Sequence, residues 1–252
     1  MSDDRTEWRF LVKARPAEGG TVTLDEDQSH RLAEVLRIGE GRTVRIFTGD
    51  GEEFEAEVLD ADRQGSTVRV LRRVRHGGTP GPELTLGFAP PRGARADWLV
   101  EKATELGAAR LVPLMCERLE RFPPEKAEKR RDRWNRKAEG AARQSERTVI
   151  PDISKPVGLR DFAGSCSAAV RLACHTGPKP QDMWSALSEL EAAPESAAVA
   201  IGPGGGFTDR ELALLARAGW SFVSLGPTTL RTETACVVAL GCLSVRTAHW
   251  TG

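Results

Sequence analysis

The sequence predicts an α/β protein in which a small β-rich domain precedes a larger domain built on a parallel sheet. Residues 1–75 alternate apolar and polar side chains over several short stretches. A stretch rich in Gly and Pro, HGGTPGPE, follows at 76–83. From residue 84 onward, strand-like and helix-like segments alternate. We therefore expect a domain at 1–75, a linker at 76–83 and a second domain at 84–252.

Composition limits the classes of protein that fit. The chain has 252 residues with 36 basic and 36 acidic side chains, which suits one long or two ordinary soluble domains. The first ten residues contain acids and no apolar segment of the signal-peptide kind, and no apolar run reaches the length of a membrane span. Five cysteines without a C-x-x-C pair predict neither a disulfide framework nor a metal site. We expect a cytoplasmic protein without a membrane segment.

The N-terminal domain is predicted to be a small β-barrel with one helix. The segments 21–24, 43–61 and 66–74 alternate apolar and polar residues, and the second contains an Asp-Gly turn. The segment 25–39 interrupts them with a helical pattern that starts with acids and ends at Gly39. Short strands around one helix are typical of a small barrel.

The larger domain is predicted to be a parallel sheet covered by helices on both faces, because strands and helices alternate at short spacing. The helix at 96–107, for example, places Leu99, Val100, Ala103 and Leu106 on one face and ends at Gly107. Expected strands are 83–89, 110–114, 168–174, 197–202 and 221–226, and the other expected helices are 124–147, 181–192 and 209–218.

The last helical segment, TACVVALGCLSV at 234–245, is apolar nearly all round. Such a helix should be buried on most sides. Burial requires that its own chain or a partner subunit encloses it.

The turn IGPGGGFTDRE, residues 201–211, joins a strand-like run to a helix-like run. It lacks the spacing of a dinucleotide fingerprint, since Phe207 occupies the position of the last Gly, and it lacks the Lys of a P-loop. One interpretation is a tight turn in which Thr208 and Glu211 form a capping box. The other is a ligand site, because glycines at the carboxyl end of a parallel strand let a ligand approach the backbone.

Basic side chains are concentrated in two places. Residues 117–147 carry eleven Lys and Arg against seven Asp and Glu, and residues 69–75 carry four Arg and no acid. Many such basic runs are solvated helix faces, but two separate basic runs in a neutral chain also fit a surface that binds nucleic acid.

Several segments together resemble the 16S ribosomal RNA uridine N3-methyltransferases, the RsmE family. They are HRLAEVLRIGEG (30–41), EKATELG (101–107), AARQSERTVIP (141–151), IGPGGGF (201–207) and LGPTTLRTETAC (225–236). The resemblance implies a SPOUT-type parallel sheet with a C-terminal trefoil knot, preceded by a PUA-like barrel. It also implies a homodimer that uses S-adenosylmethionine (S-adenosyl-L-methionine) to methylate N3 of a uridine in 16S ribosomal RNA, in the assembled small subunit.

The same resemblance implies the residues of the donor site, in three loops that each follow a strand. They are Leu172 and His175; Ile201, Gly202, Pro203, Gly204, Gly205 and Gly206; and Leu225, Gly226, Thr229, Leu230, Arg231, Thr234 and Ala235. Gly204 stands where family members usually have Glu. His175 fits either the pocket or a surface loop.

Arg231 and Glu233 are the expected catalytic residues. A cation beside the uracil carbonyls would stabilise the anion formed when N3 loses its proton, and Arg231 fits that role, although a structural pair or a phosphate contact also fits it. Glu233 fits a general base or a partner for the donor's ammonium group. Expected RNA contacts are His30, Arg31, Arg37, Arg92, Arg95, Gln144 and Arg147, of which His30 could instead cap its helix.

Two other functions fit part of the pattern. One is a SPOUT enzyme that methylates another RNA atom, such as a ribose 2′-hydroxyl. The other is a catalytically silent RNA-binding protein, for which Gly204 is an argument.

Overall fold

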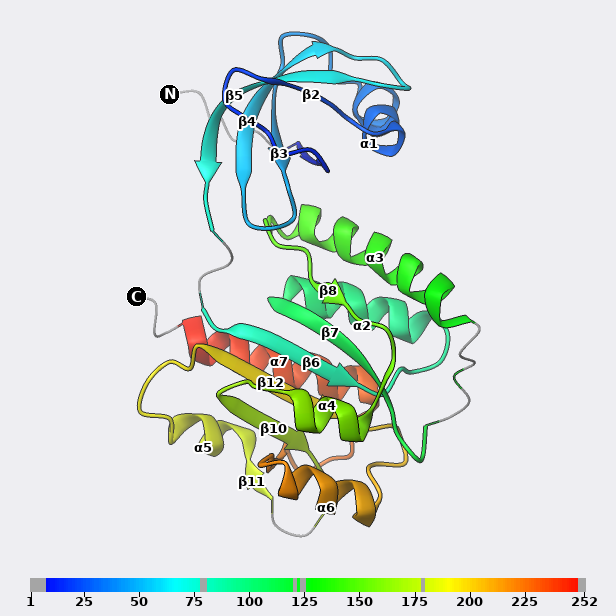
Figure 1. Ribbon diagram of the computed structural model, residues 1–252, viewed down its shortest axis with the longest axis vertical. Coiled ribbons are helices and arrows are strands. Elements are labelled where there is room, and N and C mark those ends of the chain that lie inside the picture. Colours follow the sequence, from blue (N-terminus) through cyan, green and yellow to red (C-terminus); the bar gives the residue numbers. More distant parts are fainter. Residues whose placement is uncertain (1–7, 78–80, 120–121, 123–125, 178–179, 249–252) are drawn as a thin grey trace. The chain divides into compact units, whose positions relative to one another are not determined.

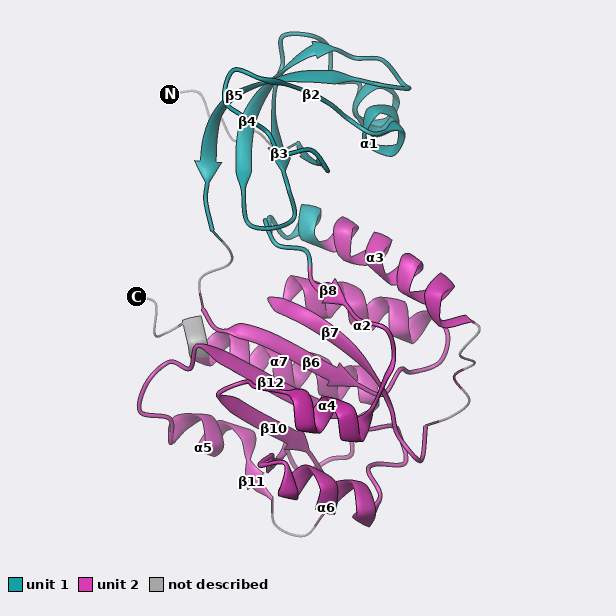
Figure 2. Ribbon diagram, in the orientation of Figure 1, with its two compact units in different colours: residues 1–79, 142–150 teal, residues 80–141, 151–252 magenta. Residues whose placement is uncertain are grey.

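The chain forms two compact units in the computed structural model (Figure 2). Unit 1 comprises residues 1–79 and 142–150, and unit 2 comprises residues 80–141 and 151–252. The structure describes residues 8–77, 81–119, 122, 126–177 and 180–248, so part of the predicted linker lies outside the described residues. The inclusion of 142–150 in unit 1 was not expected from the sequence, which predicted one continuous second domain.

Unit 1 is built on a five-stranded sheet with the strand order β1-β3-β4-β5-β2 (Figure 1). Strands β3, β4, β5 and β2 pair antiparallel, and β1 pairs parallel with β3. The strands are β1 (Arg9–Leu11), β2 (Thr21–Thr23), β3 (Thr43–Phe47), β4 (Glu53–Asp60) and β5 (Thr67–Arg75).

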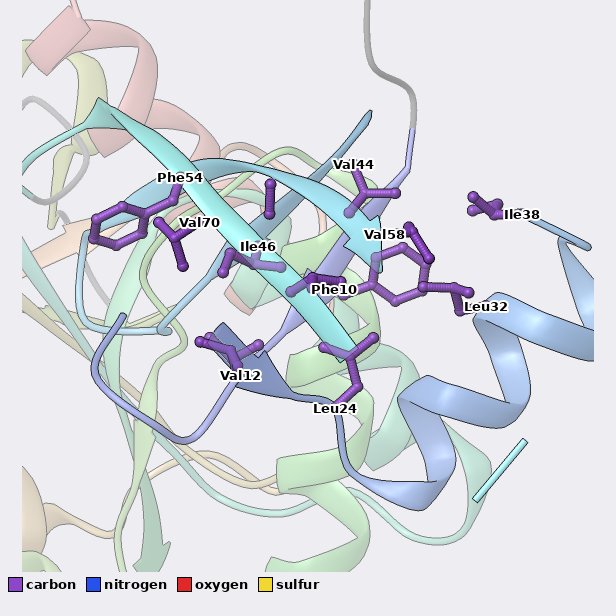
Figure 3. Close-up of a cluster of buried hydrophobic side chains, with 13 residues drawn as sticks. Phe10, Val12, Leu24, Leu32, Ile38, Val44, Ile46, Phe54, Val58 and Val70 are labelled. Carbon is purple, nitrogen blue, oxygen red and sulfur yellow. The ribbon is translucent and has the colours of Figure 1, made fainter. Parts of the chain in front are cut away.

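The core of unit 1 comes from the alternation that the sequence predicted. Val44 lies opposite Ala56, and Ile46 lies opposite Phe54, and all four side chains are buried. Figure 3 shows Val44, Ile46 and Phe54 together with other apolar side chains of this core, among them Leu32 from the helical segment. That segment is a short α-helix, α1 (Glu26–His30), which continues into a π-helical turn, η1 (Arg31–Val35).

Arg9 ties residues 142–150 to the strands of unit 1. Its buried side chain pairs with the buried carboxylate of Glu53, with an Nε–Oε1 distance of 2.6 Å. Its other nitrogens donate hydrogen bonds to the carbonyl oxygens of Ala142, Arg143 and Arg147. A buried Arg whose donors are satisfied in this way holds the segment by charge-assisted hydrogen bonds.

Unit 2 is built on a parallel sheet with the strand order β11-β13-β10-β12-β6-β7-β8, in which β9 also pairs with β7. Every pairing in it is parallel. The strands are β6 (Glu83–Phe88), β7 (Ala108–Met115), β8 (Asp152–Ile153), β9 (Val157–Gly158), β10 (Val170–Cys174), β11 (Gln181–Asp182), β12 (Ser196–Ile201) and β13 (Ser221–Ser224).

Helices cover both faces of this sheet. Successive residues of β6 point to opposite faces: Gly87 faces the ring of Phe162 in α4, while Phe88 faces Trp134 in α3. Helix α7 contacts α2, α5 and strands β6 and β12, and α4 contacts α6. The helices are α2 (Ala94–Glu105), α3 (Ala127–Gln144), α4 (Leu159–Ser165), α5 (Met183–Ser188), α6 (Asp209–Arg217) and α7 (Thr232–Ala248).

The predicted strands and helices of unit 2 are all present, with α5 shorter than expected. The sequence did not predict α4, β8, β9 or β11, and β11 occupies the first two residues of the range where a helix was expected. Among the described residues no helix is long and apolar enough to cross a membrane.

Candidate functional site

Three loops that leave neighbouring strands of unit 2 line one pocket, which we call the glycine-lined pocket. The loops follow β10, β12 and β13, which lie side by side in the sheet. The empty space in this pocket is about 640 Å³, including a part open to solvent. Its lining residues are Cys174, His175, Thr176, Ile201, Gly202, Pro203, Gly204, Gly206, Phe207, Ser224, Leu225, Gly226, Thr228, Thr229, Leu230, Thr232 and Ala235.

The Gly-rich loop is a capped turn, as the first interpretation of the sequence predicted, and it also lines a pocket, as the second interpretation requires. The Thr208 and Glu211 side chains form the predicted capping box at the start of α6. Gly206 has φ +69°, which favours glycine, and its N–H donates to the Pro203 carbonyl over 2.8 Å. A Cβ on Gly202 would lie 3.3 Å from the Phe207 ring. The close packing of this turn therefore disfavours a larger residue at 202.

The end of β10 and the loop after it contribute a neutral thiol and an imidazole. Burial raises the pKa of Cys174 to about 12, so this thiol stays protonated at neutral pH. The His175 N–H donates to the Val223 carbonyl, which fixes this loop against β13. The sequence left open whether His175 lies in the pocket or on a surface loop, and in the structure it lines the pocket.

A second cavity, which we call the cationic cavity, lies directly beside the first. It shares Pro203, Gly204 and Thr232 with the glycine-lined pocket, so the Gly-rich loop and the start of α7 form a common wall. Its other lining residues come from the ends of β6, β7 and β12 and from the first turns of α2 and α7: Ala89, Pro90, Pro91, Arg92, Arg95, Arg118, Leu119, Gly205, Arg231 and Glu233.

The cationic cavity has a positive electrostatic character. Four arginines line it, and the single acid, Glu233, is buried and forms an ion pair with Arg95 over 3.5 Å. Helices α2 and α7 also begin here, and helix N-termini carry partial positive charge. Such a cavity can bind an anionic group or stabilise negative charge that develops during a reaction.

The structure brings most of the predicted donor-site residues together at the glycine-lined pocket. Gly205 and Arg231 line the cationic cavity instead, Leu172 is buried in β10, and Thr234 is exposed outside both linings. Lining residues that the sequence analysis missed are Cys174, Thr176, Phe207, Ser224, Thr228 and Thr232. Each of them is adjacent in the sequence to a predicted residue, so extending each loop motif by one residue would have found them.

The residues predicted to contact RNA lie in both units. Arg92 and Arg95 line the cationic cavity in unit 2. In unit 1, His30, Arg37 and Gln144 are exposed. Arg31 is half-buried over the Phe10 ring and donates to the Arg9 carbonyl, and burial lowers its pKa to about 10.

Arg147 differs from the other predicted RNA contacts because it is buried, and burial lowers its pKa to about 10. Its carbonyl accepts a hydrogen bond from Arg9. No group of three or more His, Cys, Asp or Glu side chains that could hold a metal ion occurs among the described residues.

A parallel sheet whose carboxyl edge holds a glycine-lined pocket and a cationic cavity is an arrangement suited to an enzyme that joins two ligands. Comparison of sequences identifies the class. The profile of the RNA methyltransferase domain matches residues 79–244, and that of the RNA methyltransferase PUA domain matches residues 24–71. The chain belongs to this family of RNA methyltransferases.

Individual relatives share most of their length with this chain. It is 33% identical to ribosomal RNA small subunit methyltransferase E of Mycobacterium tuberculosis, over 96% of this chain and 92% of the relative. The crystal structure of the enzyme of that name from Neisseria gonorrhoeae, bound to S-adenosyl methionine, superposes with a TM-score of 0.84 at 26% identity, over 94% of this chain and 96% of that one. A Legionella pneumophila methyltransferase in complex with SAM also gives a TM-score of 0.84, at 29% identity over 96% and 97% of the two chains.

Proposed function

We propose that this chain transfers a methyl group from S-adenosylmethionine to N3 of a uridine in 16S ribosomal RNA. One observation supports this most directly: the glycine-lined pocket and the cationic cavity share the wall formed by Pro203, Gly204 and Thr232. Two ligands that occupy adjacent cavities with a common wall are held close enough to react. The relatives named for small-subunit ribosomal RNA methylation support the same substrate.

The glycine-lined pocket suits the methyl donor. Its walls are mostly backbone and small side chains, which offer amide and carbonyl groups to a polar ligand at short distance. Bound there, S-adenosylmethionine would supply an electrophilic methyl group. The Cys174 thiol is held neutral by its raised pKa, so it is a poor nucleophile toward that methyl group.

The cationic cavity suits the uracil ring in its deprotonated form. N3 lies between two carbonyl groups, so the charge left after deprotonation spreads onto their oxygens. Arg231 is exposed at the rim of this cavity, just before α7, and we propose that its guanidinium stabilises that anion.

Glu233 lines the cationic cavity and not the glycine-lined pocket. We therefore propose that its carboxylate acts on the target and not on the ammonium group of the donor. In this role it removes the N3 proton directly or through water, while Arg95 holds it in place.

We propose that RNA is recognised by both units, in the assembled small subunit and in the cytoplasm. In unit 1, the exposed His30, Arg37 and Gln144 are the proposed contacts, and Arg31 contributes where its side chain is accessible. Arg147 serves unit 1 from within, since it is buried. The match to the PUA profile supports a PUA-like fold, and we propose that the unit 1 sheet closes as a barrel around its core.

In unit 2, we propose a SPOUT-type trefoil knot closed by residues 225–248. The support is the position of α7, which contacts the central strands β6 and β12. At the start of α7, the Thr232 hydroxyl donates a hydrogen bond of 3.2 Å to the Gly202 carbonyl.

We also propose a homodimer that uses the face formed by α2, α5 and α7. Three large apolar side chains are exposed on these helices, namely Trp98, Trp184 and Val245, and more than half of Trp184 and of Val245 is accessible. A homodimer interface would cover such groups. Sedimentation that gives a monomer at micromolar concentration would contradict this assignment.

The function is tested by assaying the purified chain with 16S RNA, free and in small subunits, and with radiolabelled S-adenosylmethionine. Mass spectrometry of nucleosides from the product separates the outcomes. 3-Methyluridine supports the proposal, and a 2′-O-methylated nucleoside indicates a different RNA atom. Donor binding absent in calorimetry, with RNA binding retained, indicates a silent RNA-binding protein.

A further inference from the structure

A short turn after β7, residues 116–119, contacts the Gly-rich loop that forms the common wall of the two cavities. We propose that Arg118 in this turn is a positioning residue, which fixes the middle of that loop for both ligands. The catalytic consequence rests on the proposed methyl transfer, whereas the structural consequence does not.

Arg118 contacts the backbone of the loop directly. Its guanidinium donates a hydrogen bond of 2.8 Å to the carbonyl oxygen of Gly205, and the same nitrogen lies 3.5 Å from the carbonyl oxygen of Phe207. Its aliphatic stem lies along Gly205, since a Cβ there would be 3.4 Å from Cδ of Arg118. The side chain therefore covers the loop and caps a main-chain acceptor with a charged donor.

The neighbouring Glu117 fixes the exit of the same loop. Its N–H donates to Oε1 of Glu211 over 2.8 Å, and its carboxylate accepts the Thr208 hydroxyl over 3.1 Å. Glu211 in turn accepts the Thr208 N–H, also over 2.8 Å. Because Glu211 is buried, the two hydrogen bonds that it accepts are partly shielded from water and hold the start of α6 in place.

Between the two ends of the loop lies Gly204-Gly205-Gly206, three glycines in succession. Glycine loses more conformational freedom on ordering than any other residue, so ordering this stretch has a high entropic cost. A contact from another segment of the chain therefore matters most here. The entry is held by the Thr232 hydroxyl on Gly202 and the exit by Glu117 and Glu211. Arg118 supplies the contact in the middle.

Loss of the Arg118 contact should change both cavities, since Gly204 lines both and Gly205 lines the cationic one. Global stability should change little, because the Arg118 side chain is exposed and sits on a loop. A purely structural residue would show the opposite pattern, with a lower melting temperature and an unaltered loop.

The test compares Arg118→Ala and Arg118→Lys with Arg110→Ala. Arg110 is a matched control because it is an exposed arginine in β7, the strand before the turn that holds Arg118, and it lines a different cavity, outside the two described above. Amide hydrogen exchange is measured for the peptide covering residues 202–207 in the absence of donor, together with the melting temperature and the Kd for S-adenosylmethionine.

We expect faster exchange of this peptide in Arg118→Ala, with a melting temperature close to that of the wild type and a donor Kd raised about 3- to 10-fold, as for loss of an exposed charge-assisted hydrogen bond. Arg118→Lys should give values between those of the wild type and Arg118→Ala, because a lysine ammonium can reach one carbonyl but lacks the planar guanidinium. Millimolar guanidinium should partly restore slow exchange in Arg118→Ala. Arg110→Ala should match the wild type throughout.

Unchanged exchange in Arg118→Ala, or equal effects in Arg110→Ala, would overturn the proposal. If the wild-type chain binds no S-adenosylmethionine, the proposed function fails, but the exchange measurement still decides whether Arg118 orders the loop. The two failures are therefore distinguishable.

Discussion

The packing of Gly202 against Phe207 gives a quantitative test of the glycine-lined pocket. In Gly202→Ala the new Cβ would meet three atoms of the Phe207 ring at 3.3 Å, a contact that requires the ring or the loop to shift by a few tenths of an ångström. The ring is 4% exposed and is packed in the core cluster of unit 2 with Leu215 and Ala200, so it cannot move freely. The Thr232 hydroxyl on the Gly202 carbonyl also restrains the loop.

Overpacking of this kind costs about 1–3 kcal/mol. For a protein of this size, each kcal/mol lowers the melting temperature by about 2–4 °C, so we expect Gly202→Ala to melt about 2–12 °C below the wild type. Relief of the contact by movement of the loop would reshape the pocket. We therefore expect the Kd for S-adenosylmethionine to rise about 10-fold, which corresponds to about 1.4 kcal/mol.

The matched control for stability is Gly204→Ala, in the same loop. A Cβ at 204 has no heavy atom within 4 Å, and Gly204 does not have a positive φ. Its melting temperature should equal or slightly exceed that of the wild type, since alanine reduces the entropy of the unfolded chain. Calorimetric melting and titration with the donor measure both quantities. The reasoning is refuted if the two variants lose equal stability, or if Gly202→Ala melts like the wild type.

Three further variants test other parts of the structure. Arg231→Ala should lower the rate of single-turnover methyl transfer about 10²- to 10³-fold with the donor Kd nearly unchanged, and Arg231→Lys should recover little of it, because a point charge does not replace the planar guanidinium. Wild-type turnover in Arg231→Ala would end the catalytic assignment, whereas weaker RNA binding with a smaller salt dependence would indicate a phosphate contact. Glu211→Ala should lower the free energy of unfolding in urea by about 2–4 kcal/mol, because it removes the acceptor of two backbone N–H groups, those of Glu117 and Thr208. A decrease below about 1 kcal/mol would argue against this stabilising role of Glu211. Burial, with a contribution from Glu211, raises the pKa of Cys116 from 9.0 to about 12, so the thiol ionises first in the unfolded chain and the free energy of unfolding should fall as the pH rises from about 9 toward 12. Cys116→Ala should make this fall shallower by up to about 1.4 kcal/mol per pH unit, and an identical pH dependence in both proteins would contradict the shift.

The candidate site could be predicted in part because its motifs are local. The sequence placed glycines directly after the strand at 197–202 and Arg231 directly before the terminal helix, and both lie where ligand sites form in parallel α/β sheets. The sequence did not predict that Arg231 and Gly205 face the cationic cavity while their neighbours face the glycine-lined pocket. Which way a loop residue points depends on contacts with other segments, such as that of Arg118 with Gly205, 87 residues away along the chain.

The sequence by itself determined most of the elements of this protein. Period-two and helical hydrophobic patterns are set by neighbouring residues, so they predicted strands β2 to β5 of unit 1, the main strand–helix succession of unit 2 and the capping box at Thr208 and Glu211. The tertiary structure decided the order β13-β10-β12-β6, which brings four loops to one edge of the sheet, and the return of residues 142–150 to Arg9 in unit 1. The physical reason is that the order of parallel strands and the partner of a buried arginine are chosen by packing and desolvation between segments far apart in the chain, which no local pattern encodes.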